Sequence, residues 1–579
     1  MLVDYVANRV YKDIFELERD NNWKVLILDS MTTKILSQST KMSGLLKEKI
    51  VIIEDLNKKR RPMPELDAIY FITPTRMSLN LVVDDFVEKD QYKSKRVFVK
   101  NHPFDQLGIH LYLTDRLPDD LFSFLAASRA SKKISALREI DVAFMPFESR
   151  VFLLDEPRFY KRIIEDSYRQ RKLERLAEQL NTIAIALGGD FDMFYQSQIS
   201  NCVDLASLTR KKLNQNGRLS STIGDMIIVD RSYDPFAPLL HELTYQAMTY
   251  DVLRADGDIV KIDNRDLLLD ETEDKTWASL RHLHMADVMK KLANEYEDLM
   301  AKQKGLNKTD GTTKSLAELM RRLPHFQRQI QELERHISIS EELDKNYDTW
   351  IDDLCDVEQD LACDSIEKPI KAIIPWILNK TLSDEMKMRL ILLLCHNKKG
   401  LEEEKLVQLL KNSGIKEDQW KVVKNMRYFN ATVVENDLPV IMKMPKRKQN
   451  EEDLKFTDSR YVSRITDLIH YNHANELDDR IFTKIPSVKP KISSIKSGTQ
   501  KRKTIVFILG GVAPSEMRAA FELSNNTFKP SASWFSSKNN CTFTYDVYIG
   551  SSHIAMPHTQ LNPSLILRTL RVQVLEDTE

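Results

Sequence analysis

The residues with the clearest capacity for chemistry lie in one stretch, Met226–Leu253. Met226–Val229 is an apolar, mostly β-branched run, which is typical of a strand buried on both faces. Asp230 follows it directly. A carboxylate at the end of such a strand can serve as a nucleophile or general base, with His241 as a more distant partner. A strand, a polar loop and a helix in this order are typical of the places where α/β enzymes put an active site.

The same residues also have a structural interpretation. Asp230 and Asp234 can cap the backbone that follows and pair with Arg231 across a boundary between domains. Ser232–Pro235 predicts a turn, and Pro238 suits the first turn of a helix. Catalysis needs a constellation of groups, and no second carboxylate, nucleotide loop or metal cluster accompanies Asp230 in the sequence. The sequence therefore favours the structural role, and an α/β hydrolase or transferase using Asp230 stays open as the alternative.

Other motifs for catalysis or cofactor binding are incomplete. The chain has no GxxxxGK[ST] phosphate loop, and Gly510–Gly511 follows an expected strand without the third glycine of a dinucleotide fingerprint. His282 and His284 are two residues apart on an expected helix, so they point to different faces and do not share a metal readily. His241–Glu242 lacks the second histidine of a zinc-protease helix. We expect no catalytic residue, no cofactor and no metal.

Length and composition indicate a large, multidomain cytoplasmic protein. The chain has 579 residues, more than one hydrophobic core supports, so two to four domains are expected. The formal net charge is −1, which provides no global attraction to nucleic acid or to an acidic membrane. Five scattered cysteines without CxxC spacing fit a reducing compartment. The N-terminus lacks the apolar core of a secretory signal, and runs such as Leu390–Leu394 are far too short to span a membrane.

The elements that position Met226–Leu253 are predicted to belong to two α/β units. Expected helices separate most of the apolar runs of a first series, at 23–29, 51–55, 68–75, 96–99 and 110–115. Alternating strands and helices predict a mainly parallel, doubly wound sheet, which we assign to a first domain over residues 1–138. A second α/β unit begins with expected strands at 140–146 and 151–154, followed by helices at 172–188 and 196–216.

The second α/β unit is predicted to be discontinuous. Its next expected strands are far away in the sequence, at 504–511 and 546–550, and a sheet needs those partners. We therefore expect a second domain built from residues 139–249 and 481–579. Between its two parts, residues 250–480 are mostly helical, charged and periodic, and we assign them to a large helical third domain inserted in the second.

Two segments of the second domain have unusual composition. Residues 484–503 contain seven Lys or Arg and no acid, which predicts a solvated basic linker, with a membrane-surface or phosphate-binding patch as the alternative. Residues 525–545 are rich in Ser and Asn and show little periodicity. We expect them to form a surface insertion.

Several longer motifs resemble one family. The chain is similar to the SM proteins, the Sec/Munc-type syntaxin-binding family, and most of all to its exocytic plasma-membrane branch. The segments that carry the resemblance are WKVLILDSMTTKILS (23–37), VIIEDLNKKRRPMPELDAIYFITPT (51–75), IDVAFMPFESRVFLLD (140–155), MIIVDRSYDPFAPLLHELTYQAMTYDVL (226–253), FILGGVAPSEMRAAFEL (507–523) and DVYIGSSHI (546–554). The resemblance implies an arch of three domains without catalysis.

The resemblance also implies function and partners. SM proteins regulate SNARE-mediated vesicle docking and fusion. They hold a syntaxin, the target-membrane SNARE, in a central cleft and bind its N-terminal peptide on domain one. Domain three engages the vesicle SNARE and the assembled SNARE bundle. We therefore expect a cytoplasmic monomer that its partners recruit to the plasma membrane and that binds no nucleic acid. A helical scaffold that binds coiled coils is a further alternative.

Three sets of site residues carry over by position. The pocket for the syntaxin N-terminal peptide corresponds to Leu117, Phe122, Leu137 and Glu139. The syntaxin cleft corresponds to a polar surface with Asp29, Lys34, Lys41, Glu54, Lys59 and Arg60. From the residues alone, the apolar pocket residues could instead be core, and the cleft residues an ordinary solvated rim. The family often has Arg where Lys34 stands, and Lys cannot make a bidentate fork to a carboxylate.

The third set belongs to the helical domain. Pro324 lies inside a strongly helical stretch, where it removes a backbone hydrogen bond and kinks the helix. The resemblance makes it the hinge of a hairpin whose extension exposes a template for SNARE helices, with Ile337 and Ile339 on it. The alternative is that Pro324 occupies the first turn of a new helix.

Overall fold

The computed structural model describes most of the chain. The described residues are 1–16, 23–61, 63, 66–86, 109–156, 159, 166–255, 257–272, 274–306, 313–346, 351–363, 368–398, 400–417, 419–420, 423, 426, 432–435, 461–491, 502–525 and 545–555, with the backbone alone at 166–167, 302–306 and 313–326. The chain divides into two compact units: unit 1 is Met1–Asp230, Asp478–Leu509 and Thr544–His553, and unit 2 is Arg231–Leu477, Gly510–Phe543 and Ile554–Glu579. Each is described by itself.

Unit 1 contains a five-stranded sheet in which all neighbouring strands are parallel. Its order is β2-β1-β3-β4-β5, with β1 Lys24–Leu28, β2 Ile50–Asp55, β3 Asp67–Ile72, β4 Ile109–Leu113 and β5 Ile134–Glu139. The helices are α1 Leu2–Val10, the π-helical η1 Tyr11–Phe15, α2 Ser30–Ser39, α3 Met42–Lys47, α4 Arg76–Asp84, α5 Asp119–Ala127 and the 3-10 turn η2 Arg129–Lys132. The alternation of strand and helix follows from the apolar runs of the sequence. The strand expected at 96–99 lies outside the described residues.

Unit 1 also contains a seven-stranded sheet with the order β12-β8-β9-β13-β14-β7-β6. The strands are β6 Met145–Pro146, β7 Val151–Leu153, β8 Asp190–Gln196, β9 Thr222–Asp230, β12 Phe482–Ile485, β13 Lys503–Leu509 and β14 Asp546–Ser551, and the helices are α7 Asp166–Leu187 and α8 Ser200–Gln215. The inner pairs are parallel, and β12 and β6 are antiparallel edge strands. The domain boundaries proposed at 138, 249 and 480 stay predictions.

One close approach holds β13 against β9. A Cβ added at Gly224 would lie 1.8 Å from the carbonyl oxygen of Lys503, so only glycine fits there. The sheet thus joins segments that are almost 280 positions apart in the sequence at this pair. Closing so long a loop costs conformational entropy before the pairing stabilises the chain, so we expect these two strands to pair late in folding. All nine residues of β9 are buried.

One strand prediction was wrong, and one central strand was missed. Of the run 140–146 only Met145–Pro146 is a strand, and Asp141 has the left-handed φ of 59° that ends regular extension. The strand β8, which was missed, contains the buried carboxylates Asp190 and Asp192. Arg210 from α8 pairs with Asp190 at 2.6 Å, so a distant residue neutralises a charge that argues against a buried strand.

Unit 2 is mainly helical. Its elements are the 3-10 turn η3 Arg231–Tyr233, α9 Tyr245–Asp251, the hairpin β10 Ile259–Ile262 and β11 Arg265–Leu268, α10 Lys275–Leu280, α11 Met285–Leu306, α12 Thr313–Lys345, α13 Ile351–Cys363, α14 Pro369–Leu378, α15 Asp384–Lys398, α16 Glu403–Ser413, α18 Arg464–Ala474 and α20 Pro514–Ser524. One apolar core gathers α13 to α16, and a second gathers α9 to α12. None of the helices among the described residues combines the length and apolarity needed to cross a bilayer.

The helix after β9 begins later than expected. The sequence places its first turn at Pro238, but α9 begins at Tyr245, with Thr244 as its N-cap. The Asp234 carboxylate accepts the backbone N–H groups of Phe236 and Ala237, each at 3.2 Å. This side-chain cap stabilises a turn over the region where the apolar spacing favours a helix.

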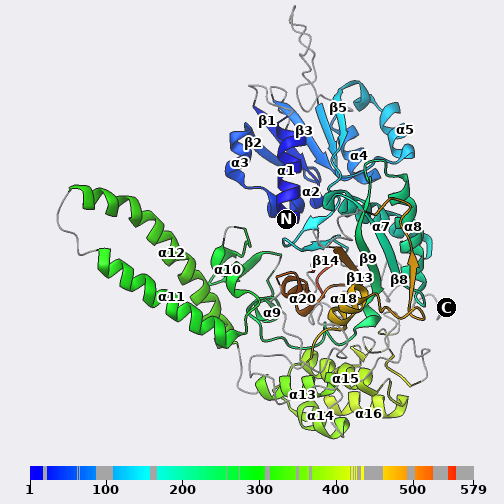
Figure 1. Cartoon of the computed structure of the whole chain (residues 1–579), viewed down its shortest axis with the longest axis vertical. Helices are drawn as coiled ribbons and strands as arrows, with labels where there is room; N and C mark the ends of the chain where they lie inside the picture. The colour runs from blue at the N-terminus through cyan, green and yellow to red at the C-terminus, as the bar shows by residue number, and fades with distance from the viewer. Residues whose placement is uncertain are drawn as a thin grey trace, which may run out of the picture. The chain divides into compact units, whose positions relative to one another are not determined.

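Helices α11 and α12 pack along each other and form a long hairpin, which we call the arm (Figure 1). Residues 307–312 between them lie outside the described residues. The backbone of α12 is helical from Thr313 through Pro324 to Lys345. The alternative in which Pro324 starts a new helix is therefore wrong, because Pro324 lies in the interior of one helix.

Candidate partner-binding surfaces

Asp234 belongs to the stretch with the clearest capacity for chemistry. Its carboxylate is engaged in hydrogen bonds with neighbouring parts of unit 2. It is buried, and its carboxylate accepts hydrogen bonds from five donors, the Phe236 and Ala237 N–H groups at 3.2 Å, the Tyr461 hydroxyl at 2.6 Å, and the Ser463 hydroxyl and Arg464 N–H at 2.8 Å. Burial acts to raise the pKa of Asp234, but the charges of Arg231 and Arg464 and these hydrogen bonds outweigh it, and the pKa lies below its usual value. A carboxylate held in this way is a structural node and a poor base.

The Arg231 guanidinium is likewise engaged in hydrogen bonds within unit 2. Its guanidinium donates to both carboxylate oxygens of Glu516, at 2.6 and 2.8 Å, and to the backbone oxygens of Asp234 and Gly511. The partner of Arg231 is therefore chiefly Glu516, 285 residues later, with Asp234 contributing its carbonyl. Asp230, the candidate nucleophile, is 1% exposed. The described contacts of Arg231 and Asp234 are therefore structural, but the carboxylate that Arg231 contacts is that of Glu516, which the sequence interpretation did not name.

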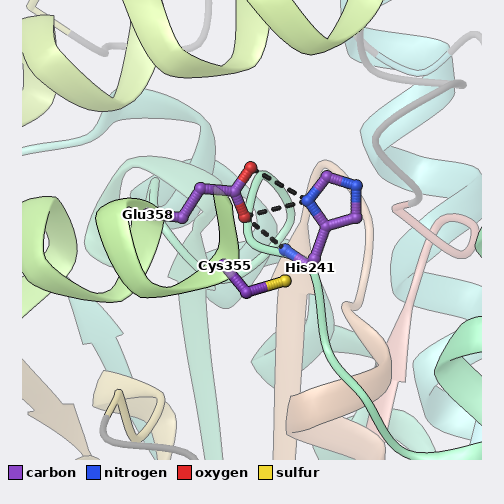
Figure 2. A group of neighbouring side chains, drawn as sticks. All are labelled: His241, Cys355 and Glu358. Atoms are coloured by element: carbon purple, nitrogen blue, oxygen red, sulfur yellow. Dashed lines mark hydrogen bonds and ion pairs between the residues drawn. The ribbon is translucent and has the colours of Figure 1, made fainter. Parts of the chain in front are cut away.

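Within the described parts of the chain, one group brings metal-binding residue types together. Ligand atoms of His241, Cys355 and Glu358 lie within 4.8 Å of one another. Figure 2 shows the Glu358 carboxylate facing Nδ1 of the imidazole, at 2.9 Å, and the backbone N–H of His241 also donates to Glu358. On the other side of the ring, Arg389 Nη1 lies 2.7 Å from Nε2.

The hydrogen bonds of this group do not fit a metal. Arg389 can only donate, so Nε2 of His241 accepts and the ring proton is on Nδ1, directed at Glu358. The nitrogen nearest the acidic ligand therefore has no lone pair for a cation. Burial raises the pKa of Cys355, and nearby Glu358 raises it further, which disfavours the thiolate that binds zinc. The group is a hydrogen-bonded junction between the 234–244 loop, α13 and α15.

The residues assigned to the peptide pocket lie on α5, on β5 and just before α5. Leu117 is buried at 5% exposure, whereas Phe122 on α5 is 55% exposed and Leu137 on β5 is 36% exposed. Glu139 at the end of β5 accepts the Leu117 N–H at 2.9 Å, which ties β5 to the start of α5. The alternative that Phe122 and Leu137 are core residues is therefore wrong. Both present apolar surface to solvent.

Three of the residues assigned to the cleft are committed to the fold. Asp29 is 4% exposed, caps α2 and accepts from Thr73 and Ser78, so its expected place on a polar surface is wrong. The Arg60 side chain is 5% exposed and pairs with Asp85 at 2.5 Å. It also lies 3.8 Å from Glu54. Each of these three side chains is thus engaged by partners within unit 1.

The other three cleft residues are cations at the surface. Lys41 and Lys59 are exposed. The Lys34 side chain is 50% exposed, and its ammonium contacts both Asp155 oxygens, at 2.7 and 2.8 Å. A partner carboxylate that reaches Lys34 therefore competes with Asp155.

An apolar surface that sequence reasoning missed lies among these cations. Val51, Ile52 and Ile53 on the edge strand β2 are 41%, 36% and 36% exposed, and Met42 and Leu46 on α3 are 61% and 56% exposed. Helix α3 packs on β2. In the sequence an apolar run of this kind predicts a buried strand, and only the edge position of β2 exposes it. Exposed apolar side chains on two neighbouring elements make this surface a candidate interaction site.

The SNARE template residues differ in exposure. Ile339 is fully buried and belongs to the core around α9, α10 and α12, so it presents no surface in this conformation. Ile337 is partly exposed. The side chain of Pro324 lies outside the described side chains.

Comparisons with known proteins give a consistent result. The model of the Sec1 family matches residues 24–562. Protein transport protein sec1 of Dictyostelium discoideum is 27% identical over 98% of this chain and 98% of its own length. SNARE-interacting protein KEULE of Arabidopsis thaliana is 28% identical over 80% of this chain and 75% of its own.

Solved structures of similar fold lead to the same family. The Unc18 chain of the Unc18–syntaxin 1 complex from Monosiga brevicollis superposes with a TM-score of 0.79 at 25% identity, covering 98% of this chain and 99% of that one. The SM protein Vps45, in complex with the Qa SNARE Tlg2, has a TM-score of 0.77 at 17% identity, covering 98% of both chains, and this likeness shows the fold. Since the family match extends over nearly the whole sequence, the chain belongs to the Sec1 family.

Proposed function

We propose that this protein is a non-enzymatic regulator of SNARE-mediated vesicle docking and fusion in exocytosis, with a target-membrane SNARE of the syntaxin class as its first partner. The names of its relatives support this: a protein transport protein, a SNARE-interacting protein and an Unc18 chain bound to syntaxin 1. The hydrogen bonds of Asp234 and His241 support the non-enzymatic part, because the carboxylate and the imidazole are both engaged in contacts of the fold.

The observation that carries the proposal is the exposure of Phe122 and Leu137. An exposed Phe and Leu on two elements tied together by the Glu139–Leu117 hydrogen bond suit a short extended peptide that inserts apolar side chains. This surface is where the N-terminal peptide of syntaxin binds in our proposal. Leu117, which is buried, supports the floor of the pocket.

A second surface of unit 1 suits the helical part of the partner. The apolar residues of β2 and α3 lie in the same elements and loops as Lys41 and Lys59. Apolar surface bordered by cations favours an amphipathic helix with acidic flanks. Holding a folded four-helix partner needs an interface on the order of 2,000 Å² or more, so these residues form one part of it.

The arm of unit 2 serves the vesicle SNARE and the assembling bundle in this proposal. Its two long helices provide a surface along which another helix can pack. Pro324 is the hinge that lets the distal part of α12 rearrange, and Ile337 contributes to the template. Recruitment to the plasma membrane follows from binding to membrane-anchored SNAREs, and the protein acts as a monomer.

The test measures binding of the purified full chain to a syntaxin cytoplasmic domain, with and without its N-terminal peptide, by titration calorimetry. Phe122→Ala removes an exposed ring worth about 1.5–3 kcal/mol when buried, so we expect at least tenfold weaker binding of the isolated peptide. Met77→Ala is the matched control, because Met77 on α4 is 66% exposed and belongs to neither surface. Equal binding by wild type and Phe122→Ala would remove the pocket from the proposal. Failure of wild type to bind the cytoplasmic domain would refute the function.

A further inference from the structure

Both helices of the arm are anchored in one core of unit 2, α11 through residues such as Val288 and Leu292, and α12 through residues 333–343, which we call the root. Leu333, Ile339 and Leu343 of the root are buried at 2%, 0% and 0% exposure. At 3.6 residues per turn, these three positions fall within about 120° of the helix circumference, so they lie on one broad side of the helix. That side of α12 packs into the core that also contains Trp277, a residue in the first turn of α10.

A polar side chain lies in the middle of this apolar face. His336 is fully buried, its Nε2 lies 2.9 and 3.0 Å from the Asp274 oxygens, and its Nδ1 lies 2.9 Å from the Tyr245 hydroxyl. The carboxylate only accepts, so the ring donates through Nε2–H, and in the neutral ring Nδ1 accepts the Tyr245 proton. Both ring nitrogens are thereby satisfied without water.

Aromatic rings fix the plane of the imidazole. The Trp277 ring stacks on His336, with centroids 6.4 Å apart and planes 6° from parallel, and Tyr245 meets it edge-on at 5.9 Å. The ring is therefore held from its faces as well as from its two nitrogens. A helix that rolls or slides must break both hydrogen bonds at once, since each depends on the direction of the ring.

Asp274 links three elements. It caps α10 by accepting the Trp277 N–H at 2.8 Å, it accepts from His336, and it lies 3.2 Å from Arg335. Burial acts to raise the pKa of Asp274, but the His336 and Trp277 hydrogen bonds and the neighbouring charges outweigh it, so the pKa is lowered. Moving α12 away would leave a carboxylate that is 3% exposed without the His336 hydrogen bond and without the Arg335 cation.

We propose that Tyr245, Asp274 and His336 are positioning residues that lock the root of the arm, so that rearrangement of the arm is confined to the part of α12 before Leu333. The direction in which the arm presents its template is then set by this polar contact, because apolar packing alone tolerates sliding. This inference rests on the proposed function only for the arm's role toward the vesicle SNARE. The lock itself is independent of any partner.

Two substitutions of His336 separate its two hydrogen bonds. In His336→Asn the amide oxygen replaces Nδ1 and keeps the Tyr245 bond, while the Asp274 bond is lost. In His336→Gln the amide nitrogen replaces Nε2 and keeps the Asp274 bond, while the Tyr245 bond is lost. Tyr245→Phe deletes one hydroxyl and is the variant least disturbing to folding. Ser338→Ala is the matched control, since Ser338 is on the exposed side of the root and bonds only its own helix.

The first measurement is hydrogen exchange of backbone amides 333–343 in the full chain. We expect exchange to rise by about tenfold or more in His336→Asn, which loses a bond to a charged group, and by about three- to tenfold in His336→Gln and Tyr245→Phe. Ser338→Ala stays within twofold of wild type. Exchange that is unchanged in all three variants overturns the lock.

The second measurement is binding. We expect the same variants to weaken binding of a vesicle-SNARE cytoplasmic segment in the same order, while binding of the isolated syntaxin N-terminal peptide stays unchanged. A variant with raised root exchange and wild-type binding to the vesicle SNARE would overturn the claim that the lock orients the template. If wild type itself fails to bind the vesicle SNARE, the proposed function fails, and the exchange result still decides the lock.

Discussion

Arg231 and Glu516, 285 residues apart in the sequence, form a buried bidentate ion pair in unit 2. The two bonds measure 2.6 and 2.8 Å, and the side chains are 4% and 0% exposed. Burial raises the pKa of Glu516, and Arg231 counters this. Glu516 also accepts the Ala513 N–H at 2.8 Å, so the pair joins the turn after β9 to the start of α20.

The first prediction concerns this pair. Arg231→Met leaves the Glu516 carboxylate buried without its cation, and we expect a loss of about 3–5 kcal/mol in the free energy of unfolding. The double variant Arg231→Met with Glu516→Leu removes both charges and should recover most of that loss. Urea denaturation of both variants measures it. A double variant no more stable than Arg231→Met would show that the pair contributes more than mutual neutralisation.

The second prediction concerns pH and His396 on α15. Burial lowers the pKa of His396 to about 4, against an ordinary value near 6.5 in the unfolded chain. Between these values the unfolded state binds the proton and the folded state does not. The contribution of His396 to the free energy of unfolding is therefore fully present above pH 6.5. It decreases by up to about 3 kcal/mol as the pH drops toward 4.

Denaturation at pH 7.5 and pH 5 measures this effect, and His396→Gln should flatten the difference between them. His470 on α18, whose pKa burial also lowers to about 4, contributes in the same direction. His470→Gln therefore serves as the comparison. A His396→Gln profile as steep as that of wild type would place the titrating group elsewhere.

The third prediction concerns metal at His241. Because the ring proton is on Nδ1 and Arg389 occupies Nε2, added zinc should not raise the melting temperature of the protein. His241→Ala removes the imidazole that lies between Glu358 and Arg389, so each of these buried charged groups loses one hydrogen-bond partner, and the change should cost about 2–4 kcal/mol. Cys355→Ser should cost less. Zinc that stabilises wild type but not Cys355→Ser would restore the metal site.

The fourth prediction concerns the hinge. Pro324 occupies the interior of α12, where proline costs about 3 kcal/mol relative to alanine. Pro324→Ala should therefore stabilise the continuous helix, lower amide exchange over residues 313–332 and strengthen vesicle-SNARE binding. Gln327→Ala, three residues along the same helix and exposed, is the control. Unchanged exchange together with unchanged binding would remove Pro324 as the hinge.

Much of the fold was predictable from local patterns. The runs Val25–Leu28 and Met226–Val229 are apolar because strands covered on both faces favour apolar side chains. The long helices of the arm followed from their periodicity. Local patterns failed where the secondary structure depends on a distant residue. In β8, Asp190 pairs with Arg210, and Asp192 pairs with Lys484 and Lys491, so two carboxylates are accommodated in a buried strand.

The candidate surfaces were predictable in part. The resemblance placed Phe122 and Leu137 by position, but their exposure depends on what packs around α5 and β5. The same reasoning placed Asp29 at a surface, whereas its carboxylate is enclosed by Thr32, Thr73 and Ser78. It also missed Val51–Ile53, since an edge strand and a central strand have the same composition.

The sequence by itself determined the alternation of strands and helices, the insertion of a helical region between distant strands, and the family. Those features depend on local periodicity and on long ordered motifs, which a linear chain displays in full. Only the tertiary structure decided which polar residues form hydrogen bonds within the fold. Asp234, His241 and His336 find partners 227, 117 and 62 residues away, and hydrogen bonds across such separations leave no local signal.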